Sequence, residues 1–317
     1  MRRRFSIGEA LGEPFRLAFK RPLMTMAWGL LSLLPGFITL AAMGPFLIEM
    51  VQNGELMAAG GQPGAGDFET FNQFMIFQAW SGLANILGLL AYLLVTTAVI
   101  RAVLAGRRRD GAAFLRLSKD EFHVAVIGLA IGVGVTFVII LAVLLVAIVG
   151  GMAVSTGDAW SMLAAVGLGV AMFLAVALVW GRLALIAPVS VMTGELAFAA
   201  GWRAGRGQTW RLFLLILAVV VVSILISIAF LILFVMAAIV FGGGLESWAD
   251  EAAVEAWMLA QLENPGLLLG LGAVALIPLS WFQGFGAALW TAPYAVAARG
   301  LTPPTTPAGA DAPEPTV

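Results

Sequence analysis

Six long apolar stretches that contain no charged residue divide the chain, and they restrict its fold more than any other feature. They cover residues 24–48, 82–100, 124–154, 161–181, 212–245 and 264–298. Each approaches or exceeds the roughly 20 apolar residues that a helix needs to cross a bilayer. Because lipid offers the backbone no hydrogen bonds, a spanning segment is either a helix or a strand of a closed barrel. Barrel strands alternate apolar and polar residues, whereas residues 212–241 do not. The sequence therefore predicts an all-α polytopic membrane protein with six transmembrane helices.

The basic residues are distributed unequally among the seven polar segments between and beyond these stretches. The first, third, fifth and seventh segments hold all 17 Lys and Arg residues, and the other three hold only acidic charges. Cytoplasmic loops accumulate Lys and Arg, so we expect both termini in the cytoplasm. Hydrophobic residues make up 61% of the chain and charged residues 11%, against about 25% charged residues in a soluble domain. One membrane domain therefore uses nearly the whole chain.

The segment boundaries follow from this pattern. We expect a cytoplasmic amphipathic segment at residues 1–23, a membrane domain at 24–298, and a disordered cytoplasmic tail at 299–317 that is rich in Pro, Ala and Thr. The expected spans are 24–48, 80–101, 124–152, 161–182, 212–241 and 267–296.

An amphipathic segment precedes the first span. Ile7, Leu11 and Phe15 recur at helical spacing after the capping box Ser6-Ile7-Gly8-Glu9, and we expect Pro14 to divide the resulting helix. Similar segments precede the third span, at 111–117, and the fifth span, at 193–211. We therefore expect three hairpins of two spans, each preceded by an amphipathic cytoplasmic helix.

The side chains offer little for catalysis. His123 is the only histidine, cysteine is absent, and the carboxylates are scattered through the loops. Glu9 and Glu13 are four residues apart, but on a surface helix, where we expect them to be solvated. The interiors of the spans carry no charge, which argues against a proton-driven pump. We expect no enzyme, no metal and no cofactor, and the basic segments are better explained by topology and anionic lipid than by nucleic acid.

Several residues could shape the interior of the membrane domain. Pro35, Pro188 and Pro278 are the expected helix breaks, and packed kinks are favoured over a binding site at each. The pairs Gly128/Gly132 and Gly266/Gly270 have the GxxxG spacing that lets helices approach closely.

The polar residues of the spans have two interpretations each. Asn85 and Gln283 either make interhelical hydrogen bonds, which we favour, or line a pathway. Arg182 lies at the inner end of the fourth span, and Glu195 is its expected partner in a buried ion pair. An interfacial arginine without a fixed partner is the alternative. Trp28 is expected at an inner membrane boundary.

The stretch that leads into the fifth span has a recognisable pattern. Ala187-Pro188, then Glu195, then Gly201-Trp202-Arg203-Ala204-Gly205-Arg206-Gly207-Gln208-Thr209-Trp210-Arg211 resembles the membrane domain of the glycerophosphoryl diester phosphodiesterase membrane-domain family and related six-span proteins of unknown function. Gly201, Ala204 and Gly205 depart from the Ser, Leu and Thr of that pattern. The resemblance implies a bacterial inner-membrane protein without catalysis of its own, because the hydrolase of fused relatives is a separate domain.

These residues predict contact with lipid headgroups. Trp202 and Trp210 can seat in the headgroup region, while Arg203, Arg206 and Arg211 can meet phosphates. We expect a non-enzymatic membrane scaffold or envelope-maintenance component that contacts anionic headgroups. A small-solute or lipid permease and a membrane anchor or regulator of a separate soluble enzyme are the alternatives. Whether the chain forms a homo-oligomer or binds another membrane protein stays open.

Overall fold

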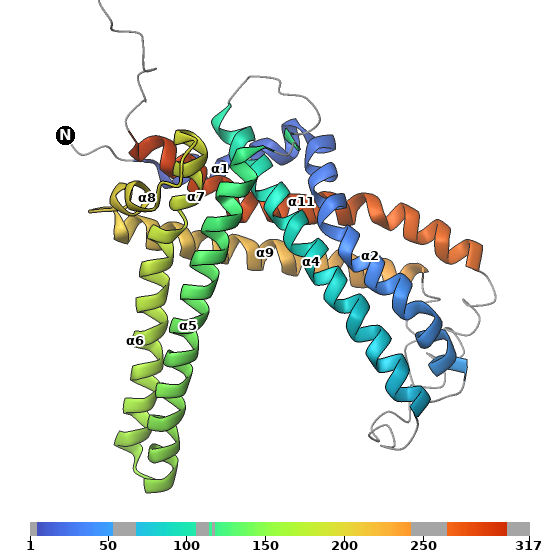
Figure 1. Cartoon of the computed structure of the whole chain (residues 1–317), viewed down its shortest axis with the longest axis horizontal. Helices are drawn as coiled ribbons and strands as arrows, with labels where there is room; N and C mark the ends of the chain where they lie inside the picture. Colours follow the sequence, from blue (N-terminus) through green and yellow to red (C-terminus); the bar gives the residue numbers. More distant parts are fainter. Residues whose placement is uncertain (1–4, 53–67, 106–113, 116–117, 242–264, 303–317) are drawn as a thin grey trace, which may run out of the picture. The chain divides into compact units, whose positions relative to one another are not determined.

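The structure has one long helix for each apolar stretch of the sequence. A computed structural model describes residues 5–52, 68–105, 114–115, 118–241 and 265–302 (Figure 1). Within these ranges every long regular element is a helix, and six helices are long and apolar enough to cross a membrane: α2 (Pro22–Gln52), α4 (Phe68–Leu104), α5 (Lys119–Thr156), α6 (Ala159–Leu183), α9 (Thr209–Phe241) and α11 (Pro265–Leu301). The all-α, six-span prediction is confirmed, and the chain is a multi-pass membrane protein.

In the part of the chain that the structure describes, three short helices accompany the long ones: α1 (Ile7–Lys20), α7 (Ile186–Thr193) and α8 (Phe198–Ala204). The hydroxyl of Ser6 accepts a hydrogen bond from the Glu9 backbone at the start of α1. The capping box at the start of α5 is complete, because the Ser118 side chain caps the helix and the Glu121 side chain caps the Ser118 backbone. Gly157, with a φ of 64°, and the N-cap Asp158 form the short turn between α5 and α6.

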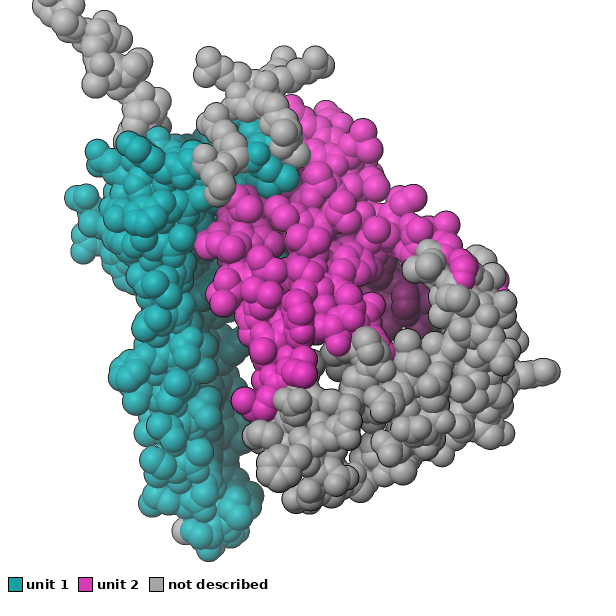
Figure 2. Space-filling model, turned by 45° about the vertical axis from the view of Figure 1, so that its right-hand side comes forward, with its two compact units in different colours: residues 1–16, 96–220, 288–317 teal, residues 17–95, 221–287 magenta. Residues whose placement is uncertain are grey.

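The chain divides into two compact units (Figure 2). Unit 1 comprises Met1–Arg16, Thr96–Val220 and Ala288–Val317, and unit 2 comprises Leu17–Val95 and Val221–Ala287. Each unit has buried residues of its own.

The core of unit 1 is built from helix ends. Its buried side chains lie at the C-terminal end of α4, the N-terminal end of α5, the end of α6 together with α7, the start of α9 and the last turns of α11; they include Val99, Ile127, Val189, Leu215 and Ala295. The charge pattern assigns all of these ends to the same side of the membrane. The packing is therefore consistent with six alternating spans.

The rest of α5 and α6 extends from this core as a hairpin. The two helices lie side by side (Figure 1), and the most apolar 18-residue window of each contains no buried residue. Side chains such as Leu144 and Phe173 are exposed along it. Exposure of apolar side chains is expected where a helix faces lipid.

Unit 2 is organised around a close crossing of α2 and α11. A Cβ atom built on Gly29 would lie 1.6 Å from the carbonyl oxygen of Ser280, and one built on Gly284 would lie 1.8 Å from the carbonyl oxygen of Thr25. Thr25, Gly29, Ser280 and Gly284 are all buried. The two helices therefore meet backbone to backbone through small residues spaced four apart on each helix, the spacing typical of tight membrane-helix pairs.

Some sequence predictions differ from this structure. Trp28, expected near an inner membrane boundary, packs inside the protein beside Gly29 in α2 and is fully buried. Conversely, no atom lies within 4 Å of a Cβ built on Gly132, Gly266 or Gly270 in the described structure, so these GxxxG glycines are not at close crossings there. The reason is that the spacing marks small residues without saying which face meets a neighbour.

The helices continue through three of the prolines. α1 continues through Pro14, α2 through Pro35 and α11 through Pro278, so none of the three ends a helix. Membrane helices tolerate proline because side-chain hydroxyls and neighbouring helices satisfy the freed backbone groups. Pro35 lacks the N–H that would donate to the Leu31 carbonyl. The hydroxyl of Thr39 donates at 3.0 Å to the carbonyl of Pro35 itself, one turn further along the helix.

The described parts of both terminal segments are more ordered than expected. Glu13 is buried and pairs with Arg16, although we expected it to be solvated. α11 continues to Leu301, past Arg299, where the tail was expected to begin. Parts of the chain lie outside the described residues, among them the remainder of that tail at 303–317, most of the segment expected at 111–117, and residues 53–67 and 242–264.

Candidate functional site

The segment between α6 and α9 folds back on itself and forms the frame of the candidate site. α6 ends at Leu183 and α7 begins at Ile186, so the predicted break near Pro188 falls just before that proline. Pro188 occupies the first turn of α7, where a backbone N–H has no helical acceptor and its loss costs nothing. Gly194, with a φ of 72°, ends α7.

α7 and α8 pack closely because of a glycine. A Cβ atom on Gly201 would lie 2.6 Å from the Cα of Ile186, so any larger residue would push α8 away from α7. The buried hydroxyl of Ser190 accepts a hydrogen bond of 2.9 Å from the backbone N–H of Ala197 and fixes the turn between the two helices. This frame places α8 beside the end of α6.

Arg182, in the last turn of α6, is held by the same segment. Its Nε donates to the hydroxyl of Thr209 at 2.9 Å, and its Nη2 donates to the same oxygen. Its guanidinium carbon lies 5.2 Å from the centre of the Trp202 ring, within the range of a cation–π contact. A Cβ on Gly205 would lie 3.1 Å from Arg182 Cγ, so the glycine leaves room for the arginine stem.

The predicted pair with Glu195 has no counterpart among these contacts. In the described part of the chain no carboxylate lies within 4 Å of Arg182, and Glu195 is exposed just beyond the end of α7. Thr209 and Trp202 take the place of that partner. Sequence reasoning could not anticipate this, because Thr209 and Trp202 meet Arg182 only after residues 184–208 fold back.

The remaining residues of the motif surround this arginine. Trp202, Arg203 and Arg206 are exposed, Trp210 is 65% exposed, and Arg211 is half-buried. The backbone of Gly207 has a φ of 78°, which turns the chain into α9 at Thr209. The indole of Trp210 stacks on Phe213 with ring centres 5.2 Å apart. Four of the five predicted headgroup residues are therefore accessible at the end of an apolar span.

Ion pairing divides the described arginines of unit 1 into two groups. Arg16, Arg101 and Arg299 each pair with a carboxylate. The other four have no carboxylate within 4 Å among the described residues, and all belong to one segment: Arg182, Arg203, Arg206 and Arg211. The described arginines of unit 1 that lack a carboxylate partner thus all lie in or next to the segment that contains α8.

A second cluster, missed in the sequence, joins α4 to α5. Arg101 is 6% exposed and sits between two carboxylates: its Nε donates to Asp120 at 3.0 Å and its Nη2 to Glu121 at 2.8 Å. It also donates to the Ser118 hydroxyl and, at 3.4 Å, to the carbonyl of Phe114. A positive charge in the last turn of a helix and negative charges in the first turn of the next helix each interact favourably with the dipole of their own helix. This placement of one arginine and two acids is the sequence feature from which the cluster could have been predicted. The cluster therefore links the end of α4 to the start of α5, and it is called the helix clasp below.

Arg299 supports the same region from α11. Its Nη1 donates to the carbonyl of Val103 at 3.2 Å, and its Nη2 lies 3.5 Å from Glu9. It therefore ties the last turn of α11 to the end of α4 and to α1.

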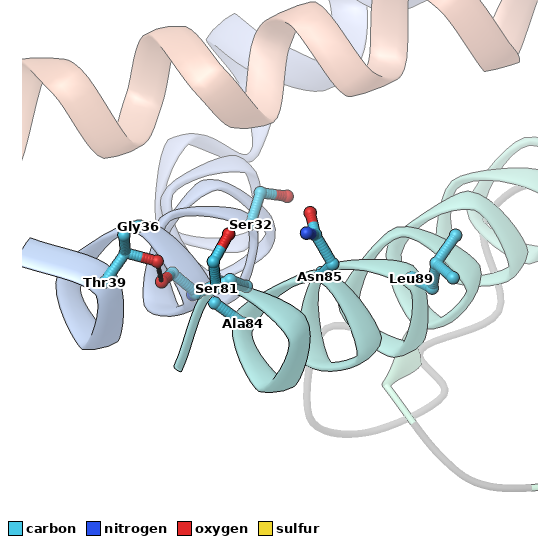
Figure 3. A pocket seen from close by; sticks show the side chains of 9 residues that line it. Ser32, Gly36, Thr39, Ser81, Ala84, Asn85 and Leu89 are labelled. Carbon is cyan, nitrogen blue, oxygen red and sulfur yellow. Dashed lines mark hydrogen bonds between the residues drawn. The ribbon is translucent and has the colours of Figure 1, made fainter. Parts of the chain in front are cut away.

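A polar groove lies elsewhere, between α2 and α4 in unit 2 (Figure 3). It encloses ≈ 540 Å³ and its polar lining consists of Ser32, Thr39, Ser81 and Asn85. The hydroxyls of Ser32 and Thr39 donate to backbone carbonyls of their own helix, each at 3.0 Å. The Ser32 and Asn85 side chains point to the same side of the groove in Figure 3, and Asn85 is exposed.

Pro35 also lines this groove. Pro35 is 13 residues beyond Pro22, or about 20 Å along the helix axis, which places the groove well inside the span. Gly88 of α4 packs on the Pro35 ring, since a Cβ there would lie 3.8 Å from Pro35 Cγ.

Comparisons with known proteins add no assignment to this geometry. In the described residues, no group of three or more His, Asp or Glu side chains is placed to hold a metal ion. No protein-family model matches the chain, and no curated protein or solved structure is significantly similar to it.

Proposed function

We propose that this protein is a non-enzymatic bacterial inner-membrane protein that binds anionic lipid headgroups through the segment around α8 and acts as a membrane scaffold or envelope-maintenance component. The observation that carries the proposal is the concentration of arginines without carboxylate partners in residues 182–211. Lipid phosphates are the counterions available at the end of a span. The positive-inside pattern and the resemblance of the motif support a cytoplasmic placement in a bacterial inner membrane.

The use of the buried carboxylates supports a non-enzymatic role. Asp120 and Glu121 bind Arg101, and Glu13 binds Arg16. A general acid or base needs a side chain free to exchange a proton with a substrate. These three carboxylates are instead used to join helices or turns.

Lipid retention after replacement of three arginines tests the proposal. The Arg203/Arg206/Arg211→Gln variant should insert with normal topology and lose its preference for anionic over zwitterionic lipid. Each basic residue near an anionic surface contributes about 1 kcal/mol, so full engagement of three corresponds to about a hundredfold in affinity. Native mass spectrometry of protein released from nanodiscs of mixed phosphatidylglycerol and phosphatidylcholine gives the ratio of retained lipids.

The matched control removes the same charge elsewhere on the predicted cytoplasmic side. Arg107/Arg108/Arg109→Gln carries an identical charge change, and it should leave the retained ratio near that of the unmodified protein. Equal losses in the two triple variants would mean that net charge alone attracts the lipid. No loss in either would refute headgroup binding by this segment.

The groove between α2 and α4 favours one second candidate, a permease for a small neutral solute or a lipid. Four uncharged polar side chains face a recess inside a span, where polar groups otherwise find partners on neighbouring helices. A pathway of this kind would be wet, and an interhelical packing site would be dry.

Cysteine accessibility separates these cases, because the chain has no native cysteine. Asn85→Cys should react with a small hydrophilic methanethiosulfonate reagent if the groove holds water, because a hydrated thiol can ionise and its thiolate attacks the reagent and displaces sulfinate. Ile86→Cys, at the adjacent exposed position that does not line the groove, should not react. An unreactive Asn85→Cys would refute the permease candidate.

A further inference from the structure

We propose that Arg182 is the recognition residue of a discrete site for the phosphate of one anionic phospholipid, framed by Trp202 and Thr209. This inference rests on the proposed function and makes it more specific. It separates one oriented, stoichiometric site from the diffuse attraction of the exposed arginines Arg203 and Arg206.

The hydrogen bonds of Arg182 leave part of its donor set available. A guanidinium has five N–H donors in a planar fork. Nε and Nη2 each direct one donor at the Thr209 hydroxyl, and the guanidinium carbon lies over the Trp202 ring, 5.2 Å from its centre. Among the described residues no acceptor is bound to Nη1. The arginine is thus held by two of its five donors, and three remain for an external acceptor, two on Nη1 and one on Nη2.

The charge of Arg182 requires such an acceptor. The side chain is half-buried in the last turn of an apolar span, and no described carboxylate lies within 4 Å. A half-buried charge without a counterion is unfavourable, whereas an arginine–phosphate contact combines charge and directed hydrogen bonds. The ligand should therefore be an oxyanion with several acceptor oxygens.

The surroundings identify a lipid phosphate rather than a soluble one. Trp180 is 38% exposed two residues before Arg182, and Trp202 is 37% exposed beside it. Such half-exposed indoles are typical of the headgroup region, where one side meets acyl chains and the other meets water. An oxyanion that reaches Arg182 there should carry acyl chains.

The Arg182 side chain is held in a fixed position before any lipid binds, unlike a mobile basic side chain on an open surface. Gly205 accommodates the arginine stem, and Gly201 sets the position of α8 and therefore of Trp202. Binding to a fixed guanidinium loses less conformational freedom than binding to a mobile side chain. Arg182→Lys keeps the charge but loses the fork and the stacking, so it tests orientation separately from charge.

The experiment measures occupancy of a single phosphatidylglycerol by native mass spectrometry at a fixed lipid-to-protein ratio. Arg182→Lys should lower the affinity for the first retained phosphatidylglycerol about tenfold, as expected when charge-assisted hydrogen bonds are lost. Arg299→Lys is the matched control, because Arg299 already has Glu9 and the Val103 carbonyl as partners, and it should bind the lipid as the unmodified protein does.

A second variant keeps the test valid if Arg182→Lys fails to fold. Thr209→Val retains the arginine and removes the acceptor that orients it, and it should weaken the same binding step several-fold. Unchanged first-lipid affinity in a folded Arg182→Lys or Thr209→Val variant would overturn the site.

Competition identifies the source of the phosphate. Millimolar inorganic phosphate or glycerophosphate should not displace the retained phosphatidylglycerol, and displacement would overturn the lipid assignment. If the Arg203/Arg206/Arg211→Gln variant loses anionic preference while Arg182→Lys does not, the proposed function stands and this site fails. If neither variant changes lipid retention, both fail.

Discussion

Replacing Gly29 by alanine tests how closely α2 and α11 pack in unit 2. The added Cβ would lie 1.6 Å from the carbonyl oxygen of Ser280 and 2.7 Å from the backbone nitrogen of Gly284. Carbon atoms in favourable contact are about 3.5–4.0 Å apart, so the two backbones would have to separate by roughly 2 Å. A backbone carbonyl cannot rotate out of the way as a side chain can. The helices must therefore move apart.

The expected loss of stability follows from this movement. Overpacking in a dense core costs typically 1–3 kcal/mol, and we expect about 3 kcal/mol here because the obstruction is backbone. Separation would also expose Trp28 and Thr25, which are now fully buried. Gly284→Ala should cost about as much, since its Cβ would lie 1.8 Å from the Thr25 carbonyl oxygen.

Gly36→Ala is the matched control on the same helix. No atom lies within 4 Å of a Cβ at residue 36 in the described structure, and alanine is a better helix former than glycine by up to about 1 kcal/mol. Unfolding in detergent micelles titrated with dodecyl sulfate, followed by tryptophan fluorescence, gives the free energy of each variant. If Gly29→Ala were as stable as Gly36→Ala, the backbone-to-backbone crossing would be wrong.

Two further predictions concern the helix clasp and the topology. Arg101→Gln should destabilise the protein by about 3 kcal/mol in the same unfolding assay, because it leaves Asp120 and Glu121 without their cation. Arg16→Gln is the control: this side chain is 50% exposed, and its replacement should cost less than about 1 kcal/mol. Equal costs would contradict a stabilising role of the helix clasp. A cysteine at Gly157 should react in intact cells with a membrane-impermeant thiol reagent, and one at Arg206 should react only after permeabilisation; labelling of the Arg206 cysteine in intact cells would overturn the six-span orientation.

The helices were predictable because their determinants are local. A charge-free run of about 20 apolar residues has few alternatives in lipid, and the capping box from Ser118 to Glu121 marks its own helix start. Both signals are contained in the sequence of the element itself. The structure extends the helices beyond the expected spans without changing their number among the described residues.

The partners of individual residues were not predictable in the same way. Arg182 meets Thr209 27 positions away, and Arg101 meets Asp120 19 positions away. Both contacts depend on how the intervening segment turns. The close crossing of α2 and α11 was missed because each helix contributes only one glycine to it, four residues after a Thr or a Ser. The GxxxG pattern instead drew attention to Gly266 and Gly270, and no described atom lies within 4 Å of a Cβ built on either.

The headgroup residues were partly predictable from the sequence. Trp202, Arg203 and Arg206 were expected at an interface from their order in the sequence, and the structure exposes all three at the end of α6. The structural roles of Gly201 and Gly205 became apparent only when Ile186 and Arg182 were seen beside them. Sequence order thus indicated which side chains face outward, and the fold explained why the glycines between them are needed.

The lipid-facing hairpin of α5 and α6 has a practical consequence for engineering. Because no side chain in the most apolar 18-residue window of either helix is buried, those positions need only be soluble in hydrocarbon and compatible with a helix. Matched deletions of one or two helical turns on both sides of Gly157 should therefore adapt the hairpin to thinner membranes. The same positions can carry spectroscopic probes that report bilayer thickness without disturbing the packed ends.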